Sequence, residues 1–321
     1  GVNMLNGFIK ISVDGTVELL QHHADLRQRF CLQYSYKPRL TAAHSGLLDT
    51  LFTGCFGAES EEYGSLILQM YGASICGVGT RLKEPKAFIL YGQTAANGKS
   101  TIQEVLRRIL PHDVICSISP GDMDKEQYLA KLIGASANLS DELSSAAAIS
   151  SDKFKAVITG DPVTAKIIYK EPVEFKPKAM HILSTNVLPS FKGGIDAGIE
   201  RRLLVIPFSR TIPVEERISD FETKLMKEQG AILISEAIRE AAMAFKNGHY
   251  SVPASCKEAT TQWMKEADTV RNWLEDGGLR RAVSKRDAKL FNEVYIYFRK
   301  DMDEVGIKYI PGLPRFNSKI R

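Results

Sequence analysis

Residues 87–110, with the sequence AFILYGQTAANGKSTIQEVLRRIL, constrain most strongly what this chain can fold into. The apolar and aromatic residues at 87–91 predict a buried strand, and a loop of small residues follows. Gly-Lys-Ser-Thr then opens an amphipathic helix that ends at Pro111. The free amide groups and the dipole at a helix N-terminus favour an anion there. This order of elements predicts a phosphate-binding loop in an α/β domain.

The loop and the first helical turn contain the candidate nucleotide ligands. We expect Lys99 to reach the β- and γ-phosphates and the Ser100 hydroxyl to hold Mg²⁺. Gly98 would let the backbone approach the phosphates closely. Gly92 and Gly98 are separated by five residues, where the usual loop has about four. Either the loop is one residue longer, or Gln93 takes the place of the first glycine. The full candidate set is Gly92, Asn97, Gly98, Lys99, Ser100 and Thr101.

The pair Asp141-Glu142 lies further along, in the segment NLSDEL. In an ATPase, Asp141 would hold Mg²⁺ through water and Glu142 would polarise the attacking water. The preceding segment, IGASAN, is less hydrophobic than a buried parallel strand usually is. An Asp that caps a helix is the alternative interpretation, so the pair alone does not decide the chemistry.

Two later segments complete a longer pattern. They are TGDPVTAKIIYKEPVEFKPKAMHILSTNVLP at 159–189 and IERRLLVIPF at 199–208. Together with GQTAANGKST and LSDEL, this order resembles the superfamily 3 helicases, above all the primase–helicases of phages, plasmids and poxviruses. The resemblance covers the whole chain. It implies an AAA+-type P-loop ATPase that assembles into a ring, commonly hexameric, with ATP and Mg²⁺ at the subunit interfaces.

The resemblance also assigns catalytic residues. Asn186 would position the lytic water, and Arg201 or Arg202 would be the finger that reaches the neighbouring subunit's ATP. An arginine on the transferred phosphoryl group can contribute about 10³–10⁵ in rate. The residues do not decide which of the two arginines serves, and an ordinary ion pair at a strand start is the alternative.

Members of this family carry a β-hairpin that grips DNA in the ring channel. Here its tip would be Lys170-Glu171-Pro172, with Lys166 on the same face. A lysine suits this role because it meets phosphates as a flexible point charge without sequence preference. A solvated hairpin lysine is the alternative.

The basic character of the chain is concentrated at its end. Residues 280–321 hold eleven Lys and Arg against five Asp and Glu, whereas the remainder has a net charge of −2. This surplus predicts a contact with a polyanion, or else a solvated face. The segment resembles a winged helix-turn-helix in which Arg315, Lys319 and Arg321 face DNA phosphates. Tyr295, Phe298 and Phe316 are at helical spacings typical of a core.

We divide the chain into a mostly helical N-terminal domain (1–72) that begins with a β-hairpin, an ATPase domain (73–215) and a helical region (216–321) with the winged-helix-like segment at about 268–321. Five scattered cysteines without a CxxC pair, and no long apolar run, lead us to expect a cytoplasmic protein without zinc, disulfides or a membrane span. The first residue is Gly, so we interpret the chain as a fragment or as carrying a tag scar.

The sequence favours an ATP-dependent DNA helicase from the replication protein of a mobile element, a phage or plasmid. It would be a homo-oligomeric ring that translocates on single-stranded DNA. Two alternatives remain open, a non-motor DNA-binding initiator controlled by ATP and a small-molecule P-loop kinase. Loss of Glu142 would stall a motor but leave the initiator working, and the basic end argues against the kinase.

Overall fold

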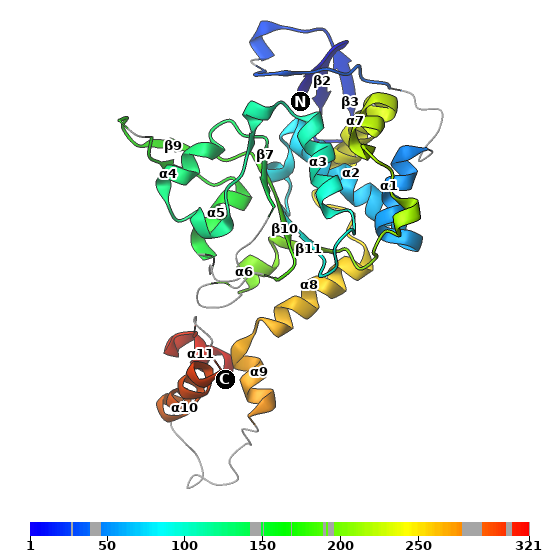
Figure 1. The fold of residues 1–321 in the computed structure, drawn as a ribbon. Coiled ribbons are helices and arrows are strands. Elements are labelled where there is room, and N and C mark those ends of the chain that lie inside the picture. The colour runs from blue at the N-terminus through cyan, green and yellow to red at the C-terminus, as the bar shows by residue number, and fades with distance from the viewer. Residues whose placement is uncertain are drawn as a thin grey trace.

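The computed structural model describes residues 1–26, 28–38, 46–141, 149, 151–167, 169–188, 191, 196–277, 291–305 and 310–320. A small sheet lies at the N-terminal end, an α/β unit occupies the centre, and helix α8 (Ala254–Glu266) leads away from it to a group of C-terminal helices (Figure 1). None of the described helices is long and apolar enough to cross a membrane.

Five parallel strands form the central sheet within the described residues, in the order β11-β5-β10-β7-β6. By position along the chain this order is fifth, first, fourth, third and second. The strands are β5 (Ala87–Tyr91), β6 (Ile115–Cys116), β7 (Ala137–Ser140), β10 (Met180–Thr185) and β11 (Leu203–Pro207). Parallel strands place all their carboxyl ends at one edge, so the segments after β5, β7 and β10 meet there. The strand predicted at 87–91 is confirmed.

Strand β7 differs from the sequence expectation. The weakly apolar segment at 133–138 was the expected strand, but the strand runs over Ala137–Ser140 and is fully buried. Its Asn138 side chain accepts a hydrogen bond from the Ile118 N–H at 2.7 Å and donates one to the Ile118 carbonyl at 2.9 Å. A polar residue is stable inside this sheet because neighbouring backbone satisfies its amide.

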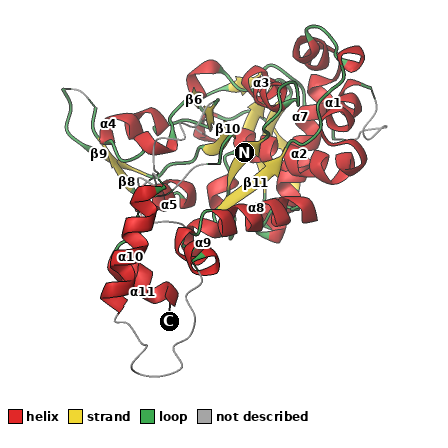
Figure 2. Cartoon of the chain, turned by 60° about the horizontal axis from the view of Figure 1, so that its bottom comes forward, coloured by secondary structure: helices red, strands yellow, loops and turns green. Residues whose placement is uncertain are grey.

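Helices cover both faces of the sheet (Figure 2). On one face α3 (Lys99–Ile109) and the long α7 (Phe221–Asn247) share a hydrophobic core with α2 (Ser60–Cys76). On the other, α5 (Ser151–Thr159) and Trp263 of α8 pack over the alternate strand residues. The division predicted after residue 72 falls inside α2. Because α2 buries its apolar side chains against the sheet and α7, the chain on both sides of that point belongs to one folded unit.

The N-terminal region begins with a sheet in the order β3-β2-β1-β4. The predicted hairpin is present, formed by β2 (Gly7–Ile11) and β3 (Val17–Leu20) around a turn in which Gly15 has φ 84°. Strand β1 (Val2–Met4) pairs antiparallel with β2 and parallel with β4 (Cys31–Leu32). This region is therefore less helical than the sequence indicated.

The C-terminal helices α9 (Thr269–Asp276), α10 (Phe291–Glu304) and α11 (Leu313–Ile320) enclose a small core of their own. Phe298 and Phe316 are fully buried beside Trp273, which confirms their expected core role. Among residues 269–277, 291–305 and 310–320 there is no strand, so the described part is a helical unit without a wing.

Candidate nucleotide and DNA sites

The predicted phosphate loop joins β5 to α3 and holds its lysine inside the protein. The Lys99 ammonium donates hydrogen bonds to the Gly92 carbonyl at 2.6 Å and to Asn186 Oδ1 at 3.0 Å. Asn186 follows directly after β10, whose last residue, Thr185, is in register with Tyr91 at the end of β5. Burial lowers the pKa of Lys99. The fold thus brings together the two residues that the sequence assigned to the phosphates and the lytic water.

Both loop glycines occupy positions that exclude a side chain. A Cβ at Gly92 would lie 2.5 Å from Asn97 Nδ2 and 2.7 Å from the Phe208 carbonyl oxygen. Gly98 has φ 89°, and a Cβ there would collide with the Cys55 thiol. The sequence left open whether Gly92 or Gln93 is the first glycine of the loop. The close contacts at Gly92, and its bond to Lys99, favour a loop that is one residue longer.

Asn97 is buried, whereas the first turn of α3 reaches the surface. The buried Asn97 side chain donates to the Thr94 carbonyl at 2.6 Å, so it braces the loop from inside. Ser100 is exposed on the first turn of α3, next to the half-buried Thr101. Among the six candidate ligands, Ser100 and Thr101 are therefore those whose polar side chains reach the surface.

Asp141 follows β7 at the same edge of the sheet. Both of its carboxylate oxygens accept hydrogen bonds at 2.8 Å from Nη2 of Arg107, which the sequence analysis did not single out. Arg107 lies about two turns beyond Ser100 on α3. A hydroxyl and a carboxylate are oxygen ligands of the kind Mg²⁺ prefers, so the donor types fit this ion, although Arg107 competes for the carboxylate. Glu142 lies outside the described residues.

Arg201 and Arg202 lie at the opposite edge of the sheet from the phosphate loop. They precede Leu203, which pairs with Ala87 at the start of β5, whereas the loop follows the other end of that strand. A strand of this length spans about 13 Å. The Arg201 side chain is exposed, while Nη1 of Arg202 donates to the Gly198 carbonyl at 2.7 Å. Burial and the charge of Arg201 lower the pKa of Arg202.

The predicted hairpin is present as β8 (Val163–Ala165) and β9 (Val173–Phe175), paired antiparallel. It projects from the body of the protein (Figures 1 and 2). Lys166 and Lys170 are exposed on the connecting loop. Tyr169 lies between them, fully exposed and with a positive φ of 61°. The sequence analysis overlooked it, although an aromatic residue between two lysines was a visible signal.

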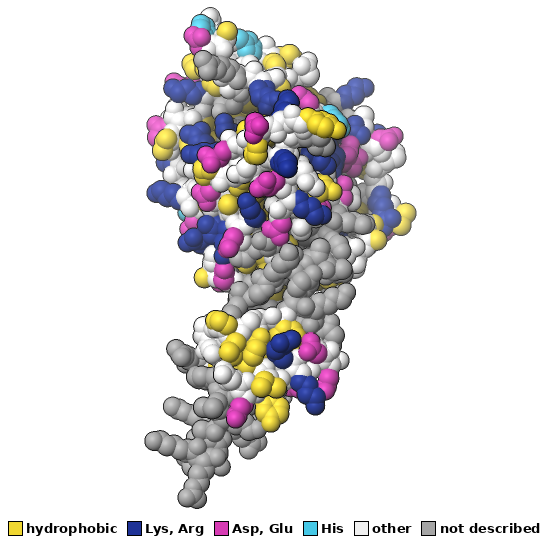
Figure 3. Space-filling model, turned by 90° about the vertical axis from the view of Figure 1, so that its left-hand side faces the viewer, with side chains coloured by type: hydrophobic (Ala, Val, Ile, Leu, Met, Phe, Trp, Pro, Cys, Tyr) yellow, Lys and Arg dark blue, Asp and Glu magenta, His cyan; other side chains and the backbone are white. Residues whose placement is uncertain are grey.

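The C-terminal basic residues are only partly described. Lys319 is exposed and forms an ion pair with Asp268. The Arg315 side chain and Arg321 lie outside the described residues. Figure 3 shows the side toward which the hairpin projects, where Lys and Arg side chains are spread among acidic ones and apolar side chains lie exposed on the C-terminal helices. Ile296 and Tyr297 of α10 are exposed.

Parts of this chain are similar in sequence to a protein family and to a viral protein. Residues 90–202 match a family of unknown function (DUF5906). A "Putative helicase" of Acanthamoeba polyphaga mimivirus is 34% identical over 165 residues, which are 49% of this chain and 16% of that protein. The chain thus corresponds to a small part of this relative's length.

Two solved apo structures of the NrS-1 C terminal region are similar in fold, each with a TM-score of 0.50. One is 15% identical and the match covers 82% of this chain and 65% of that one. The other is 14% identical, with 88% and 78% covered. The likeness shows a mixed α/β fold built on a parallel sheet with many helices.

Proposed function

We propose that this chain is the motor part of an ATP-dependent DNA helicase, an AAA+-type P-loop ATPase of superfamily 3. The observation that carries the proposal is the contact of Lys99 with Gly92 and Asn186 at the carboxyl edge of the sheet. A triphosphate on the loop would attract the ammonium from the Gly92 carbonyl. The Asn186 amide would then lie beside the γ-phosphate, where it can orient the attacking water.

The order of the central strands supports this assignment. Strand β5, which the phosphate loop follows, lies between β11 and β10 in the sheet. Asn186 follows β10, so it comes from the strand next to the loop. Ser100 and Asp141 would hold Mg²⁺, which when bound neutralises the charge that develops on the phosphates. Gln103 of α3 donates to the carbonyls of Ser140 and Ile182, so α3 is tied to the strands that precede Asp141 and Asn186.

The position of the arginine pair supports hydrolysis between subunits. Arg201 is exposed about a strand length away from its own phosphate loop, so it has access only to a nucleotide on another subunit. Arg202 is already bonded to the Gly198 carbonyl. We therefore assign the finger to Arg201. A head-to-tail contact that repeats this relationship gives a ring when its rotation closes, and hydrolysis then depends on assembly.

The projecting hairpin supports binding of single-stranded DNA. Tyr169 offers an aromatic face for a base, and Lys166 and Lys170 offer charges for the backbone on either side of it. Aromatic stacking combined with positive charge is the usual way to hold a single strand without sequence preference. The viral relative that bears the name helicase is consistent with this role. We infer that the chain belongs to the replication protein of a mobile element such as a phage.

The test is the rate of ATP hydrolysis with and without single-stranded DNA, measured together with the sedimentation of the protein. We expect DNA to stimulate turnover in a ring-sized species, and Lys99→Ala to abolish turnover in a protein that is still folded. A small-molecule kinase would ignore DNA. A non-motor initiator would bind ATP and DNA but show no stimulated turnover, and either result would contradict the proposal.

A further inference from the structure

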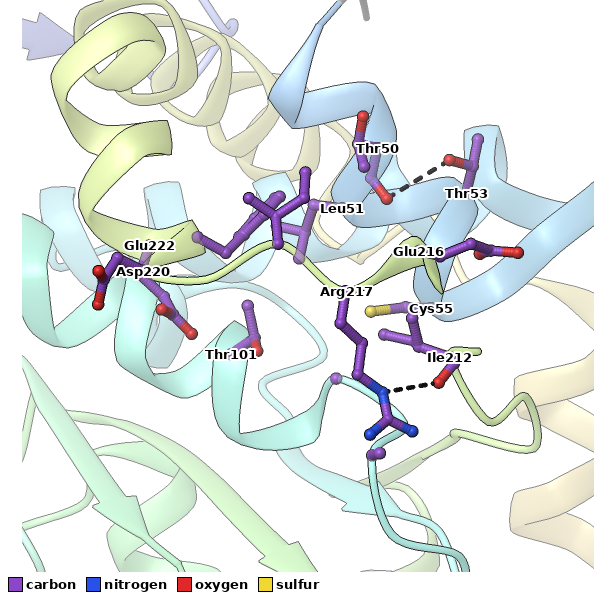
Figure 4. Close-up of a pocket in the computed structure, with 15 residues that line it drawn as sticks. Thr50, Leu51, Thr53, Cys55, Thr101, Ile212, Glu216, Arg217, Asp220 and Glu222 are labelled. Atoms are coloured by element: carbon purple, nitrogen blue, oxygen red, sulfur yellow. Dashed lines mark hydrogen bonds between the residues drawn. The ribbon is translucent and has the colours of Figure 1, made fainter. Parts of the chain in front are cut away.

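Helix α3 carries three polar side chains on the side that faces the ends of the strands. They are Lys99, Gln103 and Arg107, which are spaced four residues apart and therefore aligned along the helix. Thr101, on the opposite side, lines a cavity that α1 (Leu47–Phe56) also lines (Figure 4). Lys99 and Gln103 are buried, whereas Arg107 is partly exposed. Arg107 thus lies on the same side of α3 as the residue assigned to the phosphates.

Gln103 fixes α3 to strand β7 one turn before Arg107. Its buried side-chain amide donates to the Ser140 carbonyl at 3.4 Å, and Ser140 directly precedes Asp141. The helix is therefore attached to the strand beside the two charged side chains. Surface ion pairs usually contribute little, because two mobile side chains must be ordered. Here the backbones that carry Arg107 and Asp141 are already held together, so less order is lost when the pair forms.

Nη2 of Arg107 lies between the two carboxylate oxygens of Asp141. Both distances are 2.8 Å, so the nitrogen faces the middle of the carboxylate. From this side the carboxylate would also meet a metal ion or one of the waters bound to it. A guanidinium and a divalent cation repel each other as well. Asp141 therefore has to leave Arg107 before it can hold Mg²⁺.

The hydroxyl that we expect to hold Mg²⁺ lies toward the start of the same helix. Ser100 precedes Arg107 by about 10 Å along the helix axis. A cation on the Ser100 hydroxyl would attract the Asp141 carboxylate toward the start of α3 and away from Arg107. The carboxylate thus has two alternative positive partners, one on each side of the Gln103 contact.

We propose that Arg107 is a tethered cation that competes with Mg²⁺ for Asp141 and so sets how tightly the metal-bound nucleotide is held. The inference rests on the proposed function. Asp141 stays paired with Arg107 until a metal-bound nucleotide reaches the loop, and it returns to Arg107 when the nucleotide leaves. Because the pair must break on binding, it weakens the hold on Mg-ADP and favours release of the product. Arg107 acts through Asp141, so it is a positioning residue.

The test measures the affinity for ADP by calorimetric titration, once with Mg²⁺ and once with EDTA. The ratio of the two affinities is the contribution of the metal. Arg107→Met should raise this ratio about two- to fivefold, the range that one partly exposed ion pair contributes, because Asp141 no longer has to leave a partner. Arg108→Met is the matched control, since Arg108 is the next residue of α3 and pairs with Glu104. Its ratio should equal that of the unaltered protein.

A second comparison tests whether the effect passes through Asp141. The ratio should fall in Asp141→Asn, which lacks the charge for the metal, and the further change Arg107→Met should then leave it unaltered. Melting temperatures establish that each variant is folded, and Arg107→Gln serves if Arg107→Met is not.

A lower ratio in Arg107→Met would overturn the inference, because Arg107 would then hold Asp141 in place for the metal. An unchanged ratio would overturn it too. So would an equal rise in Arg108→Met, since the loss of any positive charge from this part of α3 would then be enough. An unaltered protein that binds ADP under neither condition would instead contradict the proposed function.

Discussion

The ammonium of Lys99 and the side-chain oxygen of Asn186 lie 3.0 Å apart, although 87 positions separate the two residues in the chain. The contact exists because β5 and β10 are neighbours in a parallel sheet, so the residues that follow them meet at one edge. The contact joins Lys99, which we expect to hold the phosphates, to Asn186, which we expect to orient the attacking water.

Asn186→Ala should separate nucleotide binding from hydrolysis. Removing a polar group that acts on the transition state typically lowers turnover by about 10²–10³, whereas Lys99 would still hold the phosphates. Steady-state turnover and ATP affinity, measured on the same preparation, check this. A tenfold or greater loss of affinity with an equal loss in kcat/KM would mean that Asn186 mainly positions Lys99.

The two neighbouring arginines should respond differently to alanine. Arg202→Ala removes a partly buried hydrogen bond to the Gly198 carbonyl and should cost about 1 kcal/mol of stability. Arg201→Ala should leave the free energy of unfolding unchanged, because its side chain is exposed, but should abolish ATP turnover. Urea unfolding and ATPase assays on both variants check this. The opposite pattern would assign the finger to Arg202.

Tyr169→Ala should weaken binding of single-stranded DNA. Loss of one stacked base costs about 1–3 kcal/mol, so the Kd should rise by about 5- to 150-fold, while Tyr169→Phe retains the stacking face. Val13→Ala, at another exposed apolar residue, in the N-terminal region, is the control. Fluorescence anisotropy with a labelled oligonucleotide measures the effect. Equal affinity for Tyr169→Ala and the control would exclude a role for the ring.

Acid should destabilise the protein through His181. This residue is buried beside Asn138, and burial lowers its pKa to about 3. Below pH 6.5 the His181 imidazole is protonated in the unfolded chain but stays neutral in the folded chain. The free energy of unfolding therefore falls as the pH drops from 6.5 toward 3. At pH 5 the loss relative to pH 7 is about 2 kcal/mol. Urea unfolding at the two pH values, compared with His181→Leu, checks this; the same pH dependence in both proteins would contradict it.

Local patterns allowed the central part of the site to be predicted. The strand before Gly92, the helix that begins at Lys99 and the buried strand that ends before Asn186 are each determined by nearby residues. The resemblance to a helicase family added the roles of Asn186 and the arginine pair. The hairpin was also predicted, with its tip at Lys170-Glu171-Pro172, but the neighbouring Tyr169 was not singled out.

Features formed by distant segments could not be read from the sequence. The polar strand β7 is stable only because Asn138 bonds the Ile118 backbone, and no local pattern reveals that partner. A cavity of about 390 Å³ beside the phosphate loop is lined in part by Gly54, Gly98 and Arg217, which come from three separate parts of the chain. Likewise, the ion pair of Lys319 with Asp268 depends on how the C-terminal helices pack.

The most direct test of hydrolysis between subunits is to mix two inactive variants, Lys99→Ala and Arg201→Ala, and to measure ATP turnover. In a mixed ring an Arg201→Ala subunit supplies an intact phosphate loop, and a Lys99→Ala neighbour supplies the arginine. Random mixing in equal amounts restores about a quarter of such interfaces, so we predict that activity returns to a comparable fraction of the unaltered protein's. No recovery at any ratio, in a mixture shown by sedimentation to assemble, would contradict the account.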